Sequence, residues 1–94
     1  MDYHGESMSA QKRSEASNRV RVYREQLGLT QLDLCRSALV SQATLKRLEA
    51  GDAPVSRVMK FRVLNALNKT RTTQNRQPLG FGDVFPNDPD PFQV

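Results

Sequence analysis

The sequence predicts an all-α fold, a small bundle of four to five short helices. Three observations lead to this prediction. The chain has 94 residues, enough for one small domain. Its apolar content is modest at 37% and it has no Trp, so the core must be small. Residues 30–51 combine apolar residues at helical spacing with two successive sets of helix start signals.

The first helix is expected to begin near Asn18. Val20, Tyr23 and Leu27 fall on one helical face, and Gly28 stands where a glycine commonly ends a helix. Residues 1–16 lack apolar periodicity and are expected to be a disordered lead-in. Within it, Lys12 and Arg13 are candidates for an arm that touches a groove or phosphates of DNA, with plain disorder as the alternative.

The stretch 30–51 resembles one long helix, but its capping signals divide it. Thr30 is a good N-cap with Asp33 three residues on, and Leu29 with Leu34 makes a hydrophobic staple. Eleven residues later the pattern repeats with Ser41 as the cap. We therefore expect two helices, at about 31–38 and 42–50, with Gly51 ending the second. They should cross steeply, with Leu39 or Val40 filling the corner between them.

The later part of the chain is expected to hold a fourth helix and one helical turn. The fourth helix should run from just after Ser56 to about Asn68, followed by a polar loop at 69–80. The turn lies within residues 81–86, and the tail 87–94 is expected to be irregular. The domain itself would then span 17–86. The residues expected to point inward are Val63, Leu64, Leu67, either Met59 or Phe61, and Phe81, Val84 and Phe85.

The chain resembles the helix-turn-helix core of the phage repressor/Cro (Xre) family of DNA-binding regulators. The matching features are Arg24, GLTQ at 28–31, Leu34 with a small residue after it, Val40-Ser41, Leu45 and LEAG at 48–51. VLNALN at 63–68 and DVFP at 83–86 resemble the last core helix and the closing segment of that family. The similarity covers about residues 18–86. It implies a lambda-repressor-like bundle with a central helix-turn-helix.

The resemblance also assigns roles to individual positions. Gln31 resembles a residue that clamps a DNA phosphate and braces the recognition helix, which here is the helix at 42–50. Gln42 occupies a position that commonly reads a base. The predicted DNA-binding set is Gln31, Ser41, Gln42, Ala43, Thr44, Lys46 and Arg47.

The chemistry of these side chains supports the assignment independently. Gln42 can bond the N6 and N7 edge of adenine, and Arg47 the O6 and N7 edge of guanine, while Ala43 can lie against a thymine methyl. Lys46 and Thr44 suit phosphate contacts. Simpler interpretations stay open: Gln42 as a helix-starting residue, Ala43 as a good helix former, and Arg47 as a phosphate ligand or a solvated charge.

Arg24 and Glu49 form a second candidate constellation. The resemblance implies a partly buried ion pair that ties the first helix to the recognition helix, and the alternative is two unrelated surface charges. Members of the family frequently have Gly at the position of Leu39, where the turn needs a left-handed backbone. Leucine there either bears a steric cost or gives the turn a different shape. Cys35 is read as a small packing residue.

The charge distribution favours a polyanionic partner. Residues 12–76 hold all fourteen Lys and Arg against five acids, a net charge of +9, while the two ends of the chain are acidic. One Cys and one distant His make no zinc site, and no phosphate loop or nucleophile constellation indicates an enzyme or a cofactor. With no secretory signal and no apolar run of membrane-spanning length, a cytoplasmic protein without membrane contact is expected.

The sequence thus predicts a regulator that binds double-stranded DNA sequence-specifically, a repressor acting as a homodimer on an inverted repeat. The segment after residue 68, with Phe81, Val84 and Phe85, is the candidate dimer surface, because the resemblance implies pairing there, with intramolecular core as the equal alternative. The rival hypothesis is a protein-interaction module, such as an antitoxin that neutralises a co-encoded partner. In that case the 69–80 loop and the acidic tail would hold the partner.

Overall fold

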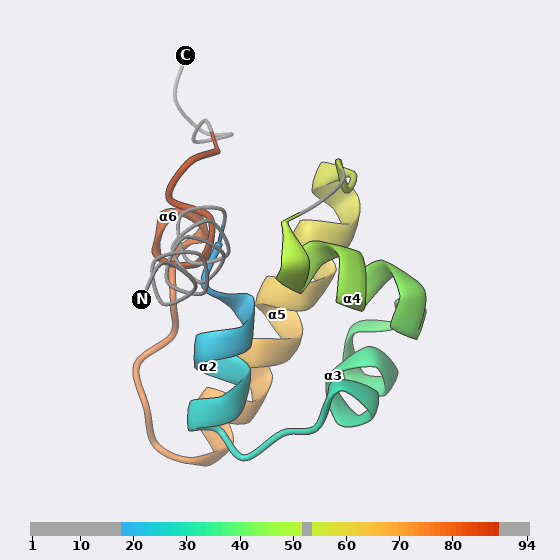
Figure 1. Ribbon diagram of the computed structural model, residues 1–94. Coiled ribbons are helices and arrows are strands. Elements are labelled where there is room, and N and C mark those ends of the chain that lie inside the picture. Colours follow the sequence, from blue (N-terminus) through green and yellow to red (C-terminus); the bar gives the residue numbers. More distant parts are fainter. Residues whose placement is uncertain (1–17, 52–53, 89–94) are drawn as a thin grey trace, which may run out of the picture.

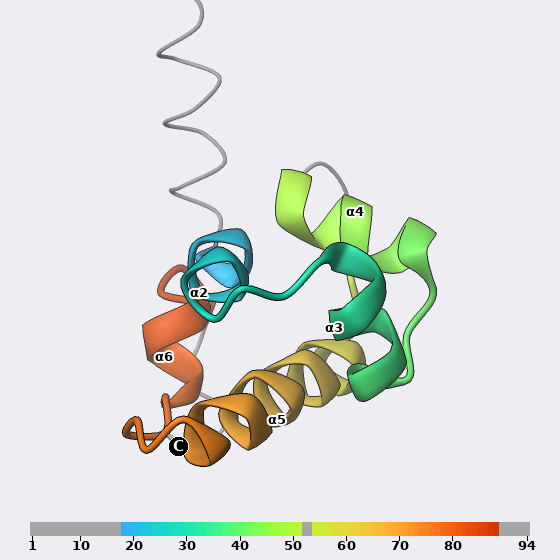
Figure 2. The ribbon, with the colours of Figure 1, turned by 90° about the horizontal axis from the view of Figure 1, so that it is seen from below.

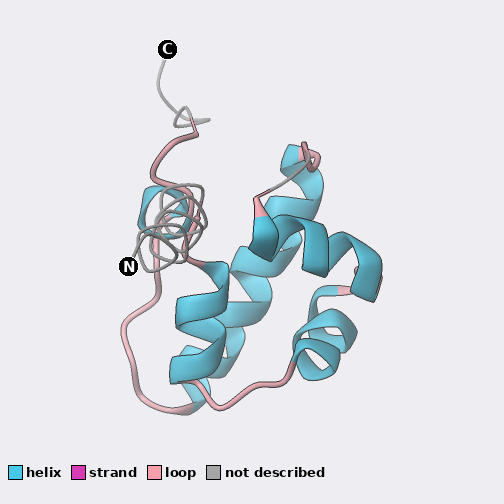
Figure 3. Cartoon of the chain, in the orientation of Figure 1, coloured by secondary structure: helices cyan, strands magenta, loops and turns pink. Residues whose placement is uncertain are grey.

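The fold is a bundle of short helices, as the sequence predicts. A computed structural model describes residues 18–51 and 54–88, and these contain five helices and no strand (Figures 1 and 3). The predicted lead-in at 1–16, with Lys12 and Arg13, and the last tail residues, 89–94, lie outside the described residues. The helices are α2 (Val20–Gln26), α3 (Gln31–Ala38), α4 (Gln42–Ala50), α5 (Arg57–Thr73) and α6 (Phe81–Val84).

Helix α2 begins two residues later than the sequence predicts. Asn18 lies before the helix, where its side-chain oxygen accepts a hydrogen bond from the Val20 amide at 3.1 Å. Val20 and Leu27 are buried in the core, and Tyr23 packs against it. Gly28 follows with φ +75°, a backbone conformation that glycine adopts without cost, so the helix ends where predicted.

Helices α3 and α4 have the predicted bounds, and the capping signals explain why. The Thr30 hydroxyl accepts from the Asp33 amide at 3.0 Å, and the Asp33 carboxylate accepts from the Thr30 amide at 3.0 Å. Ser41 caps α4, and Gly51 ends it with φ +70°. The interpretation as two helices is confirmed.

The turn between α3 and α4 uses the left-handed conformation that its sequence does not favour. Leu39 has φ 60° and ψ 45°, a conformation that costs an L-residue about 1–2 kcal/mol. Its side chain is 76% exposed, whereas Val40 packs against the core. Val40 therefore fills the corner, and the alternative that Leu39 does so is wrong.

Helix α5 extends beyond the predicted end near Asn68 and stops at Thr73. The residue that ends it is an asparagine, which is a weaker stop signal in a sequence than glycine or proline. The helix begins after Ser56, which accepts from the Met59 amide at 3.3 Å. Asn75 then has φ 60°, and the amide of Arg76 donates back to the carbonyl of Arg71 at 2.8 Å, closing a Schellman-type cap. The prediction of a loop from residue 69 is wrong for residues 69–73.

The core lies where α5 meets the other helices. Helix α5 packs against α2, α3 and α6, and α3 and α4 lie on the opposite side of the α2–α5 pair from α6 (Figures 1 and 2). Of the alternatives Met59 and Phe61, Phe61 packs against the core. The buried apolar residues are Val20, Leu27, Leu34, Cys35, Ala38, Leu45, Leu48, Val63, Leu64, Ala66, Leu67, Phe81, Val84 and Phe85.

Cys35 is part of this core. Burial, together with the negative charge of Glu49, raises the pKa of its thiol. The thiol therefore stays protonated near neutral pH, which agrees with the interpretation of Cys35 as a packing residue.

Three polar contacts fasten the segment that follows α5. The Asn68 amide group both donates to the Leu79 carbonyl at 2.9 Å and accepts from the Leu79 amide at 2.7 Å. Arg71 Nε donates to the Gln77 carbonyl at 2.6 Å. These bonds lead the chain back along α5, so that α6 can close the core.

Helix α6 belongs to the core of its own chain. Phe85 is 1% exposed, its ring centroid lies 4.9 Å from that of Phe81, and Val84 is fully buried. The Val84 carbonyl accepts from the Arg19 amide at 2.8 Å, which joins α6 to the start of α2. The prediction that these side chains point inward is confirmed. Their alternative role as an exposed dimer surface is wrong.

Candidate nucleic-acid interface

One face of α4 is exposed along its length. Gln42, Ala43, Lys46 and Arg47 are all exposed, and their spacing places them side by side on the helix. Leu45 and Leu48 on the other side are buried in the core. The structure thus brings four of the predicted DNA-binding residues together on one outward surface.

Ser41 and Thr44 build the start of this helix. The Thr44 amide donates to the Ser41 hydroxyl at 3.1 Å, and that hydroxyl donates to the Thr44 hydroxyl at 2.9 Å. Ser41 is exposed and Thr44 is half-buried. Both hydroxyls are therefore engaged in capping, although the Thr44 hydroxyl keeps its own hydrogen for a further acceptor.

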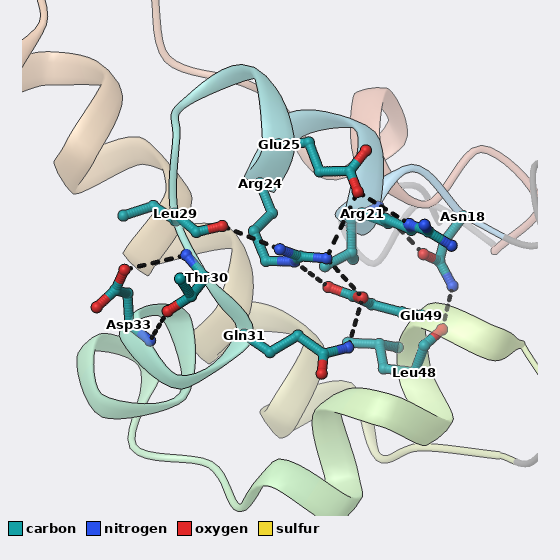
Figure 4. A network of polar contacts seen from close by, with 11 residues as sticks. Asn18, Arg21, Arg24, Glu25, Leu29, Thr30, Gln31, Asp33, Leu48 and Glu49 are labelled. Atoms are coloured by element: carbon teal, nitrogen blue, oxygen red, sulfur yellow. Dashed lines mark hydrogen bonds and ion pairs between the residues drawn. The ribbon is translucent and has the colours of Figure 1, made fainter.

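A buried carboxylate on the inner side of α4 fixes the helix to α2. Arg24 Nε lies 2.7 Å from Glu49 Oε2, and Arg24 Nη2 lies 3.3 Å from Glu49 Oε1 (Figure 4). Both residues are buried. Arg24 Nη1 also donates to the Leu29 carbonyl at 2.9 Å, so one guanidinium holds both the recognition helix and the chain leading into α3.

Gln31 joins the same carboxylate from α3. Its Nε2 donates to Glu49 Oε1 at 3.0 Å (Figure 4). Since Gln31 is the first residue of α3, this bond links the start of one helix of the motif to the last turn of the other. Gln31 is half-buried, and the second hydrogen on its Nε2 is available for another acceptor.

Two residues that hold α4 were missed by sequence reasoning. Asn18 Nδ2 donates to the Leu48 carbonyl at 2.6 Å, a buried bond to the last turn of α4. Arg62 Nη1, on α5, donates to the Leu39 carbonyl at 3.2 Å, just before α4 begins. Asn18 carried a weak signal, because asparagine is a favoured residue before a helix. Arg62 carried none, since its partner lies 23 residues away.

The positive charge around α4 is not neutralised from within the described part of the chain. Lys46 and Arg47 have no acidic partner there. The exposed side chain of Arg57 on α5 likewise has no acidic partner there, whereas Arg36 on α3 faces the carboxylate of Asp33. These cations are available to an anionic ligand such as a phosphate backbone.

The described residues contain no cluster of metal ligands and no membrane-spanning helix. Among residues 18–51 and 54–88, no three His, Cys, Asp or Glu side chains gather closely enough to hold a metal ion. None of the helices in these ranges has the length and apolarity needed to cross a membrane.

Comparison with known proteins gives a family for this geometry. Residues 15–74 match a family model described as a helix-turn-helix domain. Searches against curated proteins and against solved structures gave no match. The matched range is well over half of the chain and contains α2 to α5, with the exposed face of α4 inside it. The chain belongs to the helix-turn-helix domain family of DNA-binding proteins.

Proposed function

We propose that this protein is a cytoplasmic transcriptional regulator that binds duplex DNA sequence-specifically and represses by occupying a promoter. The observation that carries the proposal is the exposed stripe of Gln42, Ala43, Lys46 and Arg47 on a helix anchored by Glu49. An α-helix fits the major groove, where each base pair presents its own pattern of donors and acceptors. The DNA-binding unit is the domain 17–86.

Each side chain of the stripe then has a role that follows from its chemistry. Gln42 bonds the edge of an adenine, Arg47 bonds the edge of a guanine, and Ala43 lies against a thymine methyl. Lys46 and Thr44 contact phosphates, as does Gln31 through its remaining amide hydrogen. Ser41 lies at the N-terminal end of α4, where it can face the DNA backbone.

The protein is proposed to act as a homodimer on an inverted repeat. One recognition helix reads only a few base pairs, and pairing two copies doubles the information read. The half-sites would lie about 34–36 Å apart, one turn of DNA, or a multiple of that spacing. Because Phe81, Val84 and Phe85 are in the core, these three side chains do not form the pairing surface.

The rival hypothesis of a partner-neutralising module relied on the 69–80 segment and the acidic tail, and it receives no support from the first, while residues 89–94 of the tail lie outside the described residues. Residues 69–73 are the last turn of α5, and the following residues are fastened by Asn68 and Arg71. No other feature of the described residues favours that hypothesis.

The proposal is tested by selecting binding sites from a random duplex DNA pool. The wild type would be compared with Gln42→Ala and Arg47→Ala, and with Arg76→Ala, an exposed cation away from α4, as the matched control. We expect an enriched inverted repeat in which each of the first two substitutions relaxes particular positions, losing about 1–3 kcal/mol of discrimination there. The control should keep the selected sequence.

Two outcomes would contradict the proposal. Binding without enrichment that disappears as salt rises would indicate phosphate contact alone. Absence of binding to any duplex would remove DNA recognition as the function. In the favourable case, Lys46→Ala should weaken binding uniformly across sequences and reduce the salt slope by about 1.

A further inference from the structure

The turn before α4 combines three features that call for a common explanation. Leu39 has a left-handed backbone, its side chain is largely exposed, and its carbonyl accepts a hydrogen bond from Arg62 on α5. The exposed side chain gains little from burial, so the leucine does not itself stabilise the conformation of the turn. The conformation must therefore be maintained by the neighbouring structure.

The backbone hydrogen bonds of the turn explain only part of how the left-handed conformation of Leu39 is maintained. The amides of Leu39 and Val40 both reach the Cys35 carbonyl, the latter at 3.2 Å. These bonds satisfy the donors that follow α3, but they leave the Leu39 carbonyl without a backbone partner. The direction of that carbonyl depends on the φ and ψ of the turn. A donor fixed elsewhere in the molecule therefore favours the one backbone conformation that presents the carbonyl to it.

Arg62 is such a donor, because α5 is the longest helix of the bundle and packs directly on α3. Its Nη1 lies 3.2 Å from the Leu39 oxygen, and the same atom lies 4.0 Å from the sulfur of Met59, one turn earlier in α5. The opposite end of α4 is held in the same manner by Asn18, through the Leu48 carbonyl. The turn before α4 and the last turn of α4 are thus each tied through a main-chain carbonyl to a side chain outside α3 and α4.

We infer that Arg62 is a positioning residue of the DNA-binding face. By holding the Leu39 carbonyl it keeps the turn left-handed, and the turn sets the angle at which α4 leaves α3. The inference rests on the proposed function for its consequence in DNA recognition, whereas the tether itself is a property of the free protein. The competing explanation is that Arg62, an exposed cation, contacts a DNA phosphate directly.

The first arm of the test uses the free protein. Amide hydrogen exchange at Val40 would be measured for the wild type, Arg62→Met, Leu39→Gly and the double variant, with Lys69→Met, an exposed cation on the same helix, as the control. Loss of one such hydrogen bond should speed exchange about two- to tenfold. When residue 39 is glycine, Arg62→Met should speed the exchange of the Val40 amide by less than about twofold, because glycine adopts the left-handed conformation without help from Arg62.

The outcomes of this arm are distinct. Unchanged exchange in Arg62→Met, or an equal acceleration with leucine and with glycine at position 39, would overturn the inference. The control should exchange like the wild type. None of these results depends on whether the protein binds DNA.

The second arm uses the selected DNA site. A positioning role predicts that Arg62→Met relaxes the base preference at positions read by α4, and that Leu39→Gly restores it. A phosphate contact predicts a uniform loss across sequences, a salt slope reduced by about 1, and no dependence on residue 39. That second pattern would overturn the inference. Failure of the wild type to bind any duplex would instead overturn the proposed function and leave the exchange result standing.

Discussion

The ion pair of Arg24 and Glu49 joins α2 to α4 through two buried side chains. Their side chains are 11% and 6% exposed, so water cannot replace either partner. The pair Arg21–Glu25 on the surface of α2 has a similar distance, 3.1 Å, but its side chains are 69% and 55% exposed. Because both arginines lie on α2, the two pairs allow a direct comparison of a buried and an exposed ion pair.

Arg24→Met is therefore expected to destabilise the protein by about 3–5 kcal/mol, because Glu49 remains as a buried charge without its counter-ion. The double variant Arg24→Met/Glu49→Leu should recover much of this loss. Arg21→Met should cost less than about 1 kcal/mol. Urea unfolding followed by circular dichroism measures all three, and equal small losses for both arginines would contradict the buried-pair interpretation.

Asp33 gives the start of α3 a defined dependence on pH. Hydrogen bonds from the amide and hydroxyl of Thr30 favour the charged form, so the pKa of this carboxyl lies below its ordinary value of 3.8. A lowered folded pKa means that the stabilisation is present above the unfolded pKa and is lost as pH falls through the folded pKa.

The stability difference between the wild type and Asp33→Asn should therefore be constant near neutral pH and shrink as pH falls below 3.8. Urea midpoints measured for both proteins across that range provide the test. A difference that stays constant down to a pH of about 2 would show that the charge of Asp33 does not matter to α3.

At the scale of the elements, local signals predicted α3, α4 and the start of α5, and failed at the C-terminal end of α5. Thr30, Ser41 and Gly51 each act within one turn of their own helix, so their effect can be read from neighbouring residues alone. Asn75 was missed because asparagine adopts the left-handed conformation less often than glycine and is also common in loops.

The tertiary bonds of the site could not be predicted from local patterns. Asn18 reaches the Leu48 carbonyl across 30 residues, and the contact of Gln31 with Glu49, across 18, was indicated only by the family resemblance. Their geometry depends on how α2, α3 and α4 pack, which is decided by the whole core. The exposed stripe on α4 was predictable, since it follows from helical periodicity once the cap at Ser41 is recognised.

Asn68 on α5 makes two of the three hydrogen bonds that hold the segment leading to α6. Asn68→Ala removes two hydrogen bonds and leaves the Leu79 amide and carbonyl without their partner. We expect a loss of about 1–3 kcal/mol and faster hydrogen exchange at Leu79. Asn65→Ala, an exposed position on the same helix, is the matched control and should change stability by less than about 0.5 kcal/mol. Equal effects at the two positions would contradict this role.

For the whole molecule, α6 and the residue after it supply the last three buried apolar side chains of the core, Phe81, Val84 and Phe85. Phe85 is the largest fully buried side chain of the described residues, and it directly follows α6, the last helix of those residues. Phe85→Ala should cost about 3–5 kcal/mol, a large part of the stability expected of a domain of this size. Val58→Ala, at a 60% exposed apolar site on α5, is the control and should change stability little.

Thermal and urea unfolding measure these effects, and sedimentation of the milder Phe85→Leu should show the same assembly state as the wild type. A change in assembly without a change in unfolding would contradict the placement of Phe85 in the core of its own chain.

The late position of α6 also has a consequence for synthesis. The ribosome makes α2 to α5 before Phe81, Val84 and Phe85 exist, so the nascent chain exposes the apolar surface that these side chains later cover. Translation that halts before residue 85 leaves a product with an open core, which chaperones and proteases recognise. A truncated product would thus be degraded rather than survive as a competitor for the same sites.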